Sequence, residues 1–184
     1  MDLHTWITQQ VDKVEALVRA QPPAPWRYDA DEEQVLAADN IRVAETFALS
    51  NRQQRAIGAH VVAHDPDAVL RRCESDRRIL ARHRMDPAAA TSPDRATACN
   101  GCGAEWVQDS YDPFVENLND CPELRDLAHA HGLTDDIFAG LAQPQPPAPE
   151  PRSERRLGLD DILTTRPITT SDVPAALRGP RWKP

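Results

Sequence analysis

The chain has 184 residues, a formal charge of −8 at pH 7 and only 5% aromatic residues, so we expect one small folded core with additional segments. The acidic excess argues against non-specific nucleic-acid binding and against attraction to anionic membranes, because both depend on basic side chains. The N-terminal stretch does not have the continuous apolar region of a signal peptide, because Asp2 and Asp12 interrupt it. No apolar segment of the sequence is long enough for a transmembrane helix. We therefore expect a cytoplasmic protein with reduced thiols.

An amphipathic helix is predicted from Asp2 to Ala20. Four apolar residues recur there at intervals of four, three and four and define one face: Ile7, Val11, Val14 and Val18. Because strand-like segments follow directly in the chain, we expect this face to cover a sheet.

A small three-stranded antiparallel sheet is predicted next. Its strands are expected in residues 26–29, 34–38 and 41–48, where Val, Ile and Phe favour strands. Asp39-Asn40 between the last two strands can adopt the positive φ angles of a tight hairpin turn. Trp26, as a large aromatic residue, is predicted to pack on the core face.

Two further helices are predicted between Arg52 and Arg84, separated at His64-Asp65-Pro66. Asp65 is a good N-cap, because its carboxylate can accept from free backbone N–H groups, and Pro66 suits the first helical position. The second helix has one apolar stripe, made of Val69, Leu70, Cys73 and Leu80. We expect the two helices to pack as a pair against a common core.

A set of short motifs characterises the chain as a whole. The motifs are Pro25-Trp26-Arg27, His60 to Pro66, Val69-Leu70-Arg71, Arg77 to Leu80, Cys99 to Cys102, Asp120 to Ala128, and the terminal Trp182-Lys183-Pro184. In this combination the chain resembles DUF6221, an actinobacterial and actinophage family of unknown function, over most of residues 1–132. The resemblance implies a helix, a Pro-Trp entry into a small sheet, the helix break and a Cys-x-x-Cys module, and it implies no activity.

Three cysteines carry the clearest chemistry. Cys99-Asn100-Gly101-Cys102 has the form of a zinc knuckle, in which two thiolates grip one ion across a tight turn. Cys121 follows Asp120, a plausible N-cap, and precedes Pro122, so it lies at a helix N-terminus, where the helix dipole stabilises a thiolate. The three cysteines therefore predict structural Zn²⁺ as a cofactor.

The fourth ligand is not specified by this pattern. Candidates are His131, Asp120, His83, Asp112 and a water molecule. His129 is disfavoured, because eight helical residues place it roughly 12 Å along the axis from Cys121. Two alternatives remain open: three thiols without metal, and a catalytic zinc with an open water position. A redox Cys-x-x-Cys is disfavoured, because no βαβ unit surrounds it.

Two other features have a structural and a functional interpretation. His60 and His64 lie four apart on a helix and could share a metal, but His64 is also favoured by the dipole at a helix C-terminus. Cys73 lies on an apolar stripe, where a buried free thiol is a common core residue.

The expected organisation is α+β. Residues 1–85 form the body with helix, sheet and helix pair, residues 86–97 a linker, residues 98–141 a zinc-knuckle module, and residues 142–184 a Pro-rich disordered tail. The tail holds seven basic and five acidic residues, so it is +2 and the remainder is −10. Its residues 143–151 form a polyproline spacer, and residues 157–163 form an apolar segment that could fold on a partner.

These observations favour a non-enzymatic accessory or regulatory protein with a structural zinc site and a protein partner bound through residues 152–184. The first alternative is a nucleic-acid-binding zinc protein, which the acidic charge disfavours. The second is a metal-dependent hydrolase, for which the sequence offers no organised general base. The oligomeric state is not specified by the sequence.

Overall fold

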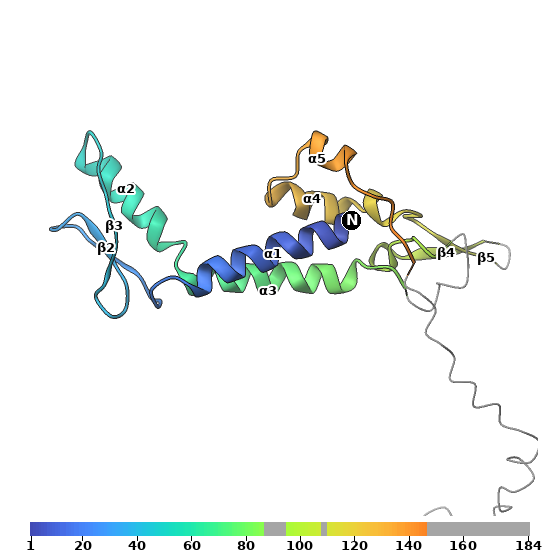
Figure 1. The fold of residues 1–184 in the computed structure, drawn as a ribbon, viewed down its shortest axis with the longest axis horizontal. Helices are drawn as coiled ribbons and strands as arrows, with labels where there is room; N and C mark the ends of the chain where they lie inside the picture. The colour runs from blue at the N-terminus through green and yellow to red at the C-terminus, as the bar shows by residue number, and fades with distance from the viewer. Residues whose placement is uncertain (87–94, 108–109, 147–184) are drawn as a thin grey trace, which may run out of the picture. The chain divides into compact units, whose positions relative to one another are not determined.

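The computed structural model describes residues 1–86, 95–107 and 110–146 (Figure 1), all of which belong to one compact unit, Met1–Pro149. This part of the chain is α+β, as predicted, with five helices, a three-stranded sheet and a two-stranded sheet. No helix in it is both long enough and apolar enough to cross a membrane. The predicted disordered tail lies, from residue 147 onward, outside the described residues.

Helix α1 (Leu3–Arg19) begins where the sequence predicts. Asp2 is its N-cap, and the side chain accepts a hydrogen bond from the Thr5 N–H at 2.8 Å. The buried residues of α1 repeat at helical spacing and form one face: Leu3, Trp6, Ile7, Val11 and Val18.

That face packs against α3 (Pro66–Arg82) and α4 (Pro122–Ala130), so the prediction that it covers the sheet is wrong. Helix α3 offers a matching stripe through Cys73 and Leu80, and its Arg77 guanidinium donates to Glu15 of α1 at 2.9 Å. Apolar contact and charge pairing thus both select α3 as the neighbour of α1, although the sheet follows α1 in the chain.

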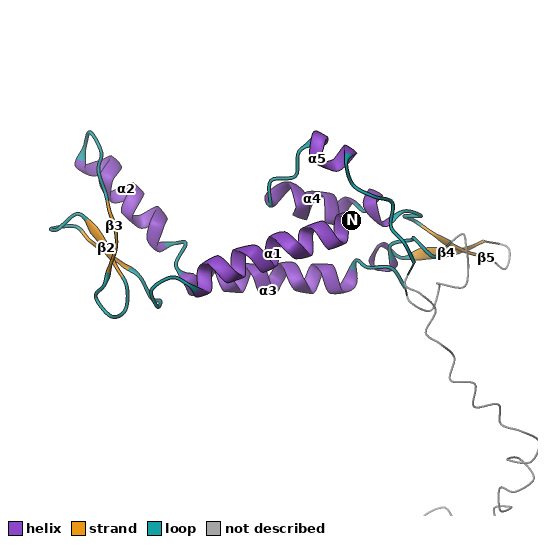
Figure 2. Ribbon diagram, viewed as in Figure 1, coloured by secondary structure: helices purple, strands orange, loops and turns teal. Residues whose placement is uncertain are grey.

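The predicted three-stranded antiparallel sheet is present. Strands β1 (Arg27–Asp29), β2 (Gln34–Leu36) and β3 (Arg42–Glu45) pair in this order (Figure 2). Asn40 in the turn between β2 and β3 has a φ of 62°, as expected for a tight hairpin. The small core of the sheet consists of Trp26, Val35 and Ala37, which confirms the core position of Trp26.

Helix α2 (Asn51–Val62) packs on this sheet rather than on the core of α3. Its close approach requires Gly58, since a Cβ added there would lie 2.3 Å from the Tyr28 ring. The predicted break is confirmed: Asp65 caps α3 by accepting from the Ala68 N–H at 2.8 Å, and Pro66 is its first residue. The expectation of a common core for α2 and α3 is wrong, because the two helices bury their faces in separate clusters.

The second half of the described chain is built around short elements. A 3₁₀ turn (Asn100–Cys102) precedes a hairpin of β4 (Ala104–Val107) and β5 (Ser110–Pro113), and a second turn (Leu118–Asp120) leads into α4. Helix α5 (Asp135–Ala139) follows α4 and was not predicted. Residues from these turns and from α4 enter the same core as α1 and α3.

Asn119 joins three segments at this core. Its buried side chain accepts from the Leu3 N–H at 2.9 Å and donates to the Ala142 carbonyl at 3.0 Å. The Ala142 N–H in turn donates to the Met1 carbonyl at 2.9 Å. The start of α1 is therefore held by the segment that leads into α4.

Candidate metal centre

Four potential metal ligands converge from separate segments. His83 follows the last residue of α3, Cys99 precedes the first 3₁₀ turn, Cys102 ends that turn, and Cys121 is the N-cap residue of α4. One ligand atom from each residue lies within 4.8 Å of the other three. His83, Cys99 and Cys121 are buried and Cys102 is half-buried, so the cluster is part of the core and is open on one side.

Four of the separations between ligand atoms are close contacts of 3.4 to 3.8 Å. His83 Nδ1 lies 3.4 Å from the Cys121 Sγ, 3.6 Å from the Cys99 Sγ and 3.8 Å from the Cys102 Sγ. The sulfur atoms of Cys102 and Cys121 are 3.5 Å apart. These four side chains are therefore close enough to bind a single metal ion.

Backbone contacts hold the knuckle against the end of α3. The Asn100 N–H donates to the Arg84 carbonyl at 3.0 Å, and the Cys99 N–H donates to the Val115 carbonyl at 2.9 Å. Gly101 permits this approach, because an added Cβ would lie 2.6 Å from the Arg82 carbonyl oxygen and 2.8 Å from His83 Nδ1. Gly101, which lies between the two cysteines, thus allows the Cys99–Cys102 turn to lie against His83.

Burial dominates the electrostatics of the thiols. It raises the pKa of Cys121 to about 11, although the Leu124 backbone N–H donates to this sulfur and lowers the pKa. Burial also raises the pKa of Cys102 well above its usual range, with further contributions from the neighbouring thiols. Thiols in such a setting release their protons when a cation binds, so binding of a metal ion here would be coupled to proton release.

A carboxylate touches the open side of the cluster. Glu123 Oε2 lies 3.5 Å from the Cys102 Sγ and 3.5 Å from the Cys121 Sγ, and both thiols can donate to it. The pKa of the Glu123 carboxyl is lowered, first by its own backbone N–H and then by these thiols. Glu123 was not predicted as a site residue; its place at the start of α4, two residues after Cys121, is the signal that could have indicated it.

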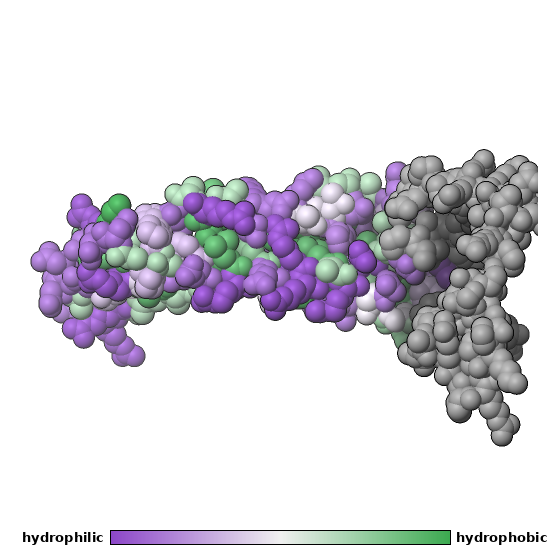
Figure 3. Space-filling model, turned by 90° about the horizontal axis from the view of Figure 1, so that it is seen from below, coloured by the Kyte–Doolittle hydropathy of each residue, from purple (hydrophilic) through white to green (hydrophobic). Residues whose placement is uncertain are grey.

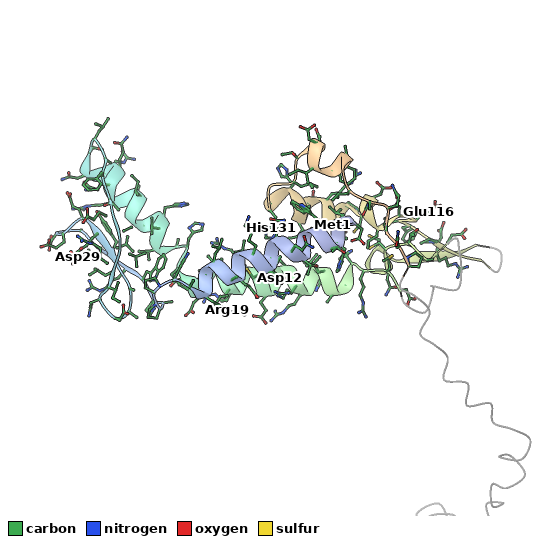
Figure 4. The ribbon with its side chains drawn as sticks, viewed as in Figure 1. Met1, Asp12, Arg19, Asp29, Glu116 and His131 are labelled. Carbon is green, nitrogen blue, oxygen red and sulfur yellow. The ribbon has the colours of Figure 1, made fainter. Side chains whose placement is uncertain are left out.

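The structure distinguishes among the four side chains considered as the fourth ligand. Only His83 joins the cluster. His131 instead contacts Asp76 of α3 at 2.9 Å (labelled in Figure 4), and Asp120 pairs with Arg125 at 3.0 Å. Asp112 is an exposed residue of β5. The sequence does contain a signal for His83, because Leu80 follows Cys73 by seven residues and His83 follows Leu80 by three, so His83 continues the buried stripe of α3 just beyond its last residue.

The remaining candidates lie elsewhere. His60 and His64 are both exposed with ring centroids 4.4 Å apart, and His64 Nδ1 is 2.8 Å from the His60 carbonyl oxygen. Cys73 is a buried core residue between α1 and α3. In the described ranges, the cluster of His83 with three cysteines is the one group of at least three metal-binding side chains.

Comparison with known proteins assigns the family. Residues 1–133 match DUF6221, a family of unknown function, and the chain belongs to this family. No curated protein and no solved structure matches the chain. The comparisons thus supply no activity, and functional inference depends on the geometry of the cluster.

Proposed function

We propose that this member of DUF6221 is a non-enzymatic accessory or regulatory protein whose core is held together by a structural zinc ion. The observation that carries this proposal is the convergence of His83 with Cys99, Cys102 and Cys121 in one mostly buried cluster. Because three separate segments contribute the ligands, one ion would tie the end of α3, the knuckle and the start of α4 to each other.

The ligand separations support zinc. With Zn–S distances near 2.3 Å and Zn–N distances near 2.0–2.1 Å, neighbouring ligands of a tetrahedral zinc lie roughly 3.4–3.8 Å apart. The His83 Nδ1 contacts and the Cys102–Cys121 sulfur contact span 3.4 to 3.8 Å. Thiolate ligands also disfavour Mg²⁺ and Ca²⁺, which prefer oxygen.

The number of protein ligands supports a structural rather than a catalytic ion. Catalytic zinc sites keep one coordination position for water or substrate, whereas structural sites are closed by four protein side chains. Here four side chains are present, and two of them, Cys99 and Cys121, lie in the same core cluster as Leu3 and Ile7 of α1. The ion would therefore act through the stability of the fold.

Native mass spectrometry with matched variants tests this proposal. We expect one zinc ion per chain in the wild type, and its loss in Cys121→Ser and in His83→Ala, together with a lower melting temperature. Cys73→Ser and His131→Ala change the same residue types outside the cluster and should keep the ion. Wild-type protein that is free of zinc after purification without chelators, or variants that retain it equally well, would refute the proposal.

We also propose a protein partner and a compartment, and both proposals are supported by the sequence. The basic, Pro-rich residues 152–184 contain an apolar segment, which supports a role in binding a protein partner. Free thiols in a metal site need a reducing environment, which supports a cytoplasmic location. Removing residues 152–184 should abolish co-purification of a specific partner while leaving zinc content unchanged, and an unaltered set of co-purifying proteins would contradict the role of this segment.

A further inference from the structure

Glu123 occupies a defined position relative to the four potential ligands. Its Oε2 atom is 3.5 Å from the Cys102 Sγ, 3.5 Å from the Cys121 Sγ and 3.9 Å from His83 Nδ1. These distances are close to four of the separations between the ligand atoms themselves, which are 3.4 to 3.8 Å, and all of the ligand atoms lie within 4.8 Å of one another. The carboxylate oxygen therefore lies directly next to three of the four ligand atoms, on the outside of the cluster.

The three contacted atoms identify one face of the cluster. Four ligand atoms in a tetrahedral arrangement have four faces, and the face made by His83, Cys102 and Cys121 is the one opposite Cys99. Glu123 Oε2 caps this face. A cation between the four ligands would have Cys99 on one side and the Glu123 carboxylate on the opposite side.

The more exposed side chains of the cluster belong to this face. The Glu123 side chain is 53% exposed, whereas that of His83 is 10% exposed. Cys102 is half-buried, while Cys99 and Cys121 are 1% and 0% exposed. A metal ion arriving from solvent would therefore meet the Glu123 carboxylate and the Cys102 thiol before it met the other ligands.

We propose that Glu123 is an entry ligand, through which a zinc-type divalent cation enters and leaves the centre. This inference rests on the proposed zinc site and adds a residue and a route to it. The carboxylate attracts the hydrated cation and can replace one of its waters, because carboxylates are zinc ligands. The three sulfur atoms and His83 Nδ1 then take over the ion, and the thiol protons pass to water.

Charge explains why the carboxylate is a transient ligand. A divalent ion with three thiolates and a neutral imidazole already carries a net negative charge. A further anion at the capping position is then repelled, whereas the same anion favours a cation that is still partly hydrated. Glu123 should therefore accelerate both binding and release without strengthening the equilibrium affinity.

Metal-exchange kinetics on the full chain test this role. The probes are Zn²⁺ and Co²⁺ added to reduced, metal-free protein, with Co²⁺ followed by its visible absorption, and release of bound metal to excess EDTA. Glu123→Gln keeps the side-chain shape and removes the charge, and we expect association and release to slow by about tenfold each, the lower end of the range by which charged groups at a site accelerate association. Asp126→Asn is the matched control, because it removes one exposed carboxylate from the same helix.

The outcomes separate this inference from the proposed function. Unchanged rates in Glu123→Gln would overturn the entry role while the zinc site stands. Faster release with weaker affinity would also overturn it, because Glu123 would then be a permanent ligand. A wild type that binds neither ion would refute the zinc site and the entry role together.

Discussion

Two regions of this molecule bury their hydrophobic residues in different ways. The core between α1, α3 and α4 contains long apolar side chains and also Cys99 and Cys121 of the metal cluster. The core between α2 and the three-stranded sheet has three buried members, Trp26, Val35 and Ala37. The first core thus has a candidate metal cross-link within it, and the second depends on one large aromatic residue.

The second region compensates for its small core with polar contacts. Buried Gln54 of α2 donates to the Thr46 carbonyl, and the Thr46 hydroxyl donates to the Glu33 carbonyl at 2.9 Å. Near them, Phe47 and Leu49 remain 78% and 101% exposed. Figure 3 likewise shows hydrophobic residues among hydrophilic ones on one face of the molecule. The comparison indicates that metal should govern the stability of the first region and have little effect on the second.

The largest effect should come from metal removal. Chelation, or Cys121→Ser, removes an interaction with an apparent binding free energy of about 10–16 kcal/mol in small zinc modules. Hydrogen exchange should then accelerate in α1 and α4, because Leu3, Ile7 and Cys121 share one core. Protection in β1, β2, β3 and α2 should be retained. An equal loss of hydrogen-exchange protection in both regions would show that the two cores are not independent.

The reverse experiment is Trp26→Ala. It should destabilise the sheet and α2 by about 3–5 kcal/mol, because it removes the largest buried side chain of that core. Zinc content and the protection of α1 should be unchanged. Loss of zinc in this variant, measured by native mass spectrometry, would contradict the separation of the two regions.

An intermediate effect is expected for Gly101→Ala. The new methyl group would lie 2.6 Å from the Arg82 carbonyl oxygen and push the knuckle away from His83, so we expect a loss of zinc affinity of about 10–100-fold. The control is Gly140→Ala, where the nearest atom would lie 3.5 Å away. Competition with a chromophoric chelator measures both, and equal affinities would argue against the contact between Gly101 and His83.

The smallest effect concerns the joint between α2 and α3. Asp65→Ala removes the side chain that accepts from the Ala68 N–H and should cost about 1 kcal/mol in urea unfolding. Asp65→Asn keeps an N-capping oxygen and should cost less. Both variants should retain zinc. If Asp65→Ala lowers the free energy of unfolding no more than Asp65→Asn does, the Asp65 side chain does not stabilise α3 as an N-cap.

Local signals in the sequence were sufficient for several of the elements. The helical spacing in α1, the Asp39-Asn40 turn and the Asp65-Pro66 break each depend on a few neighbouring residues, and each is present in the structure. The partner of α1 was mispredicted, because sequence neighbours suggested the sheet whereas long-range apolar contact and the Arg77–Glu15 pair selected α3. Interactions between nearby residues thus determine where a helix or turn forms, whereas contacts between distant residues determine which element it packs against.

The candidate site was predictable only in part: the cysteines were identified from the sequence, and the other residues were not singled out. The cysteine spacing indicated three thiols near one ion, and the structure brings Cys99, Cys102 and Cys121 together. His83 could not be ranked above His131 or Asp120, because its proximity depends on how the knuckle approaches the end of α3 through Gly101. Glu123 was not predicted, because its contacts with the Cys102 and Cys121 thiols are visible only in the folded structure.

X-ray absorption at the zinc edge of the purified full chain would identify the ligands of the ion. We expect one bound zinc with three sulfur ligands at about 2.3 Å and one nitrogen ligand near 2.0–2.1 Å. In His83→Ala, any zinc that remains should lose the nitrogen shell and keep the sulfur shell. A spectrum with only oxygen and nitrogen ligands, or with four sulfur ligands, would contradict the assignment of His83 and the three cysteines as one zinc site.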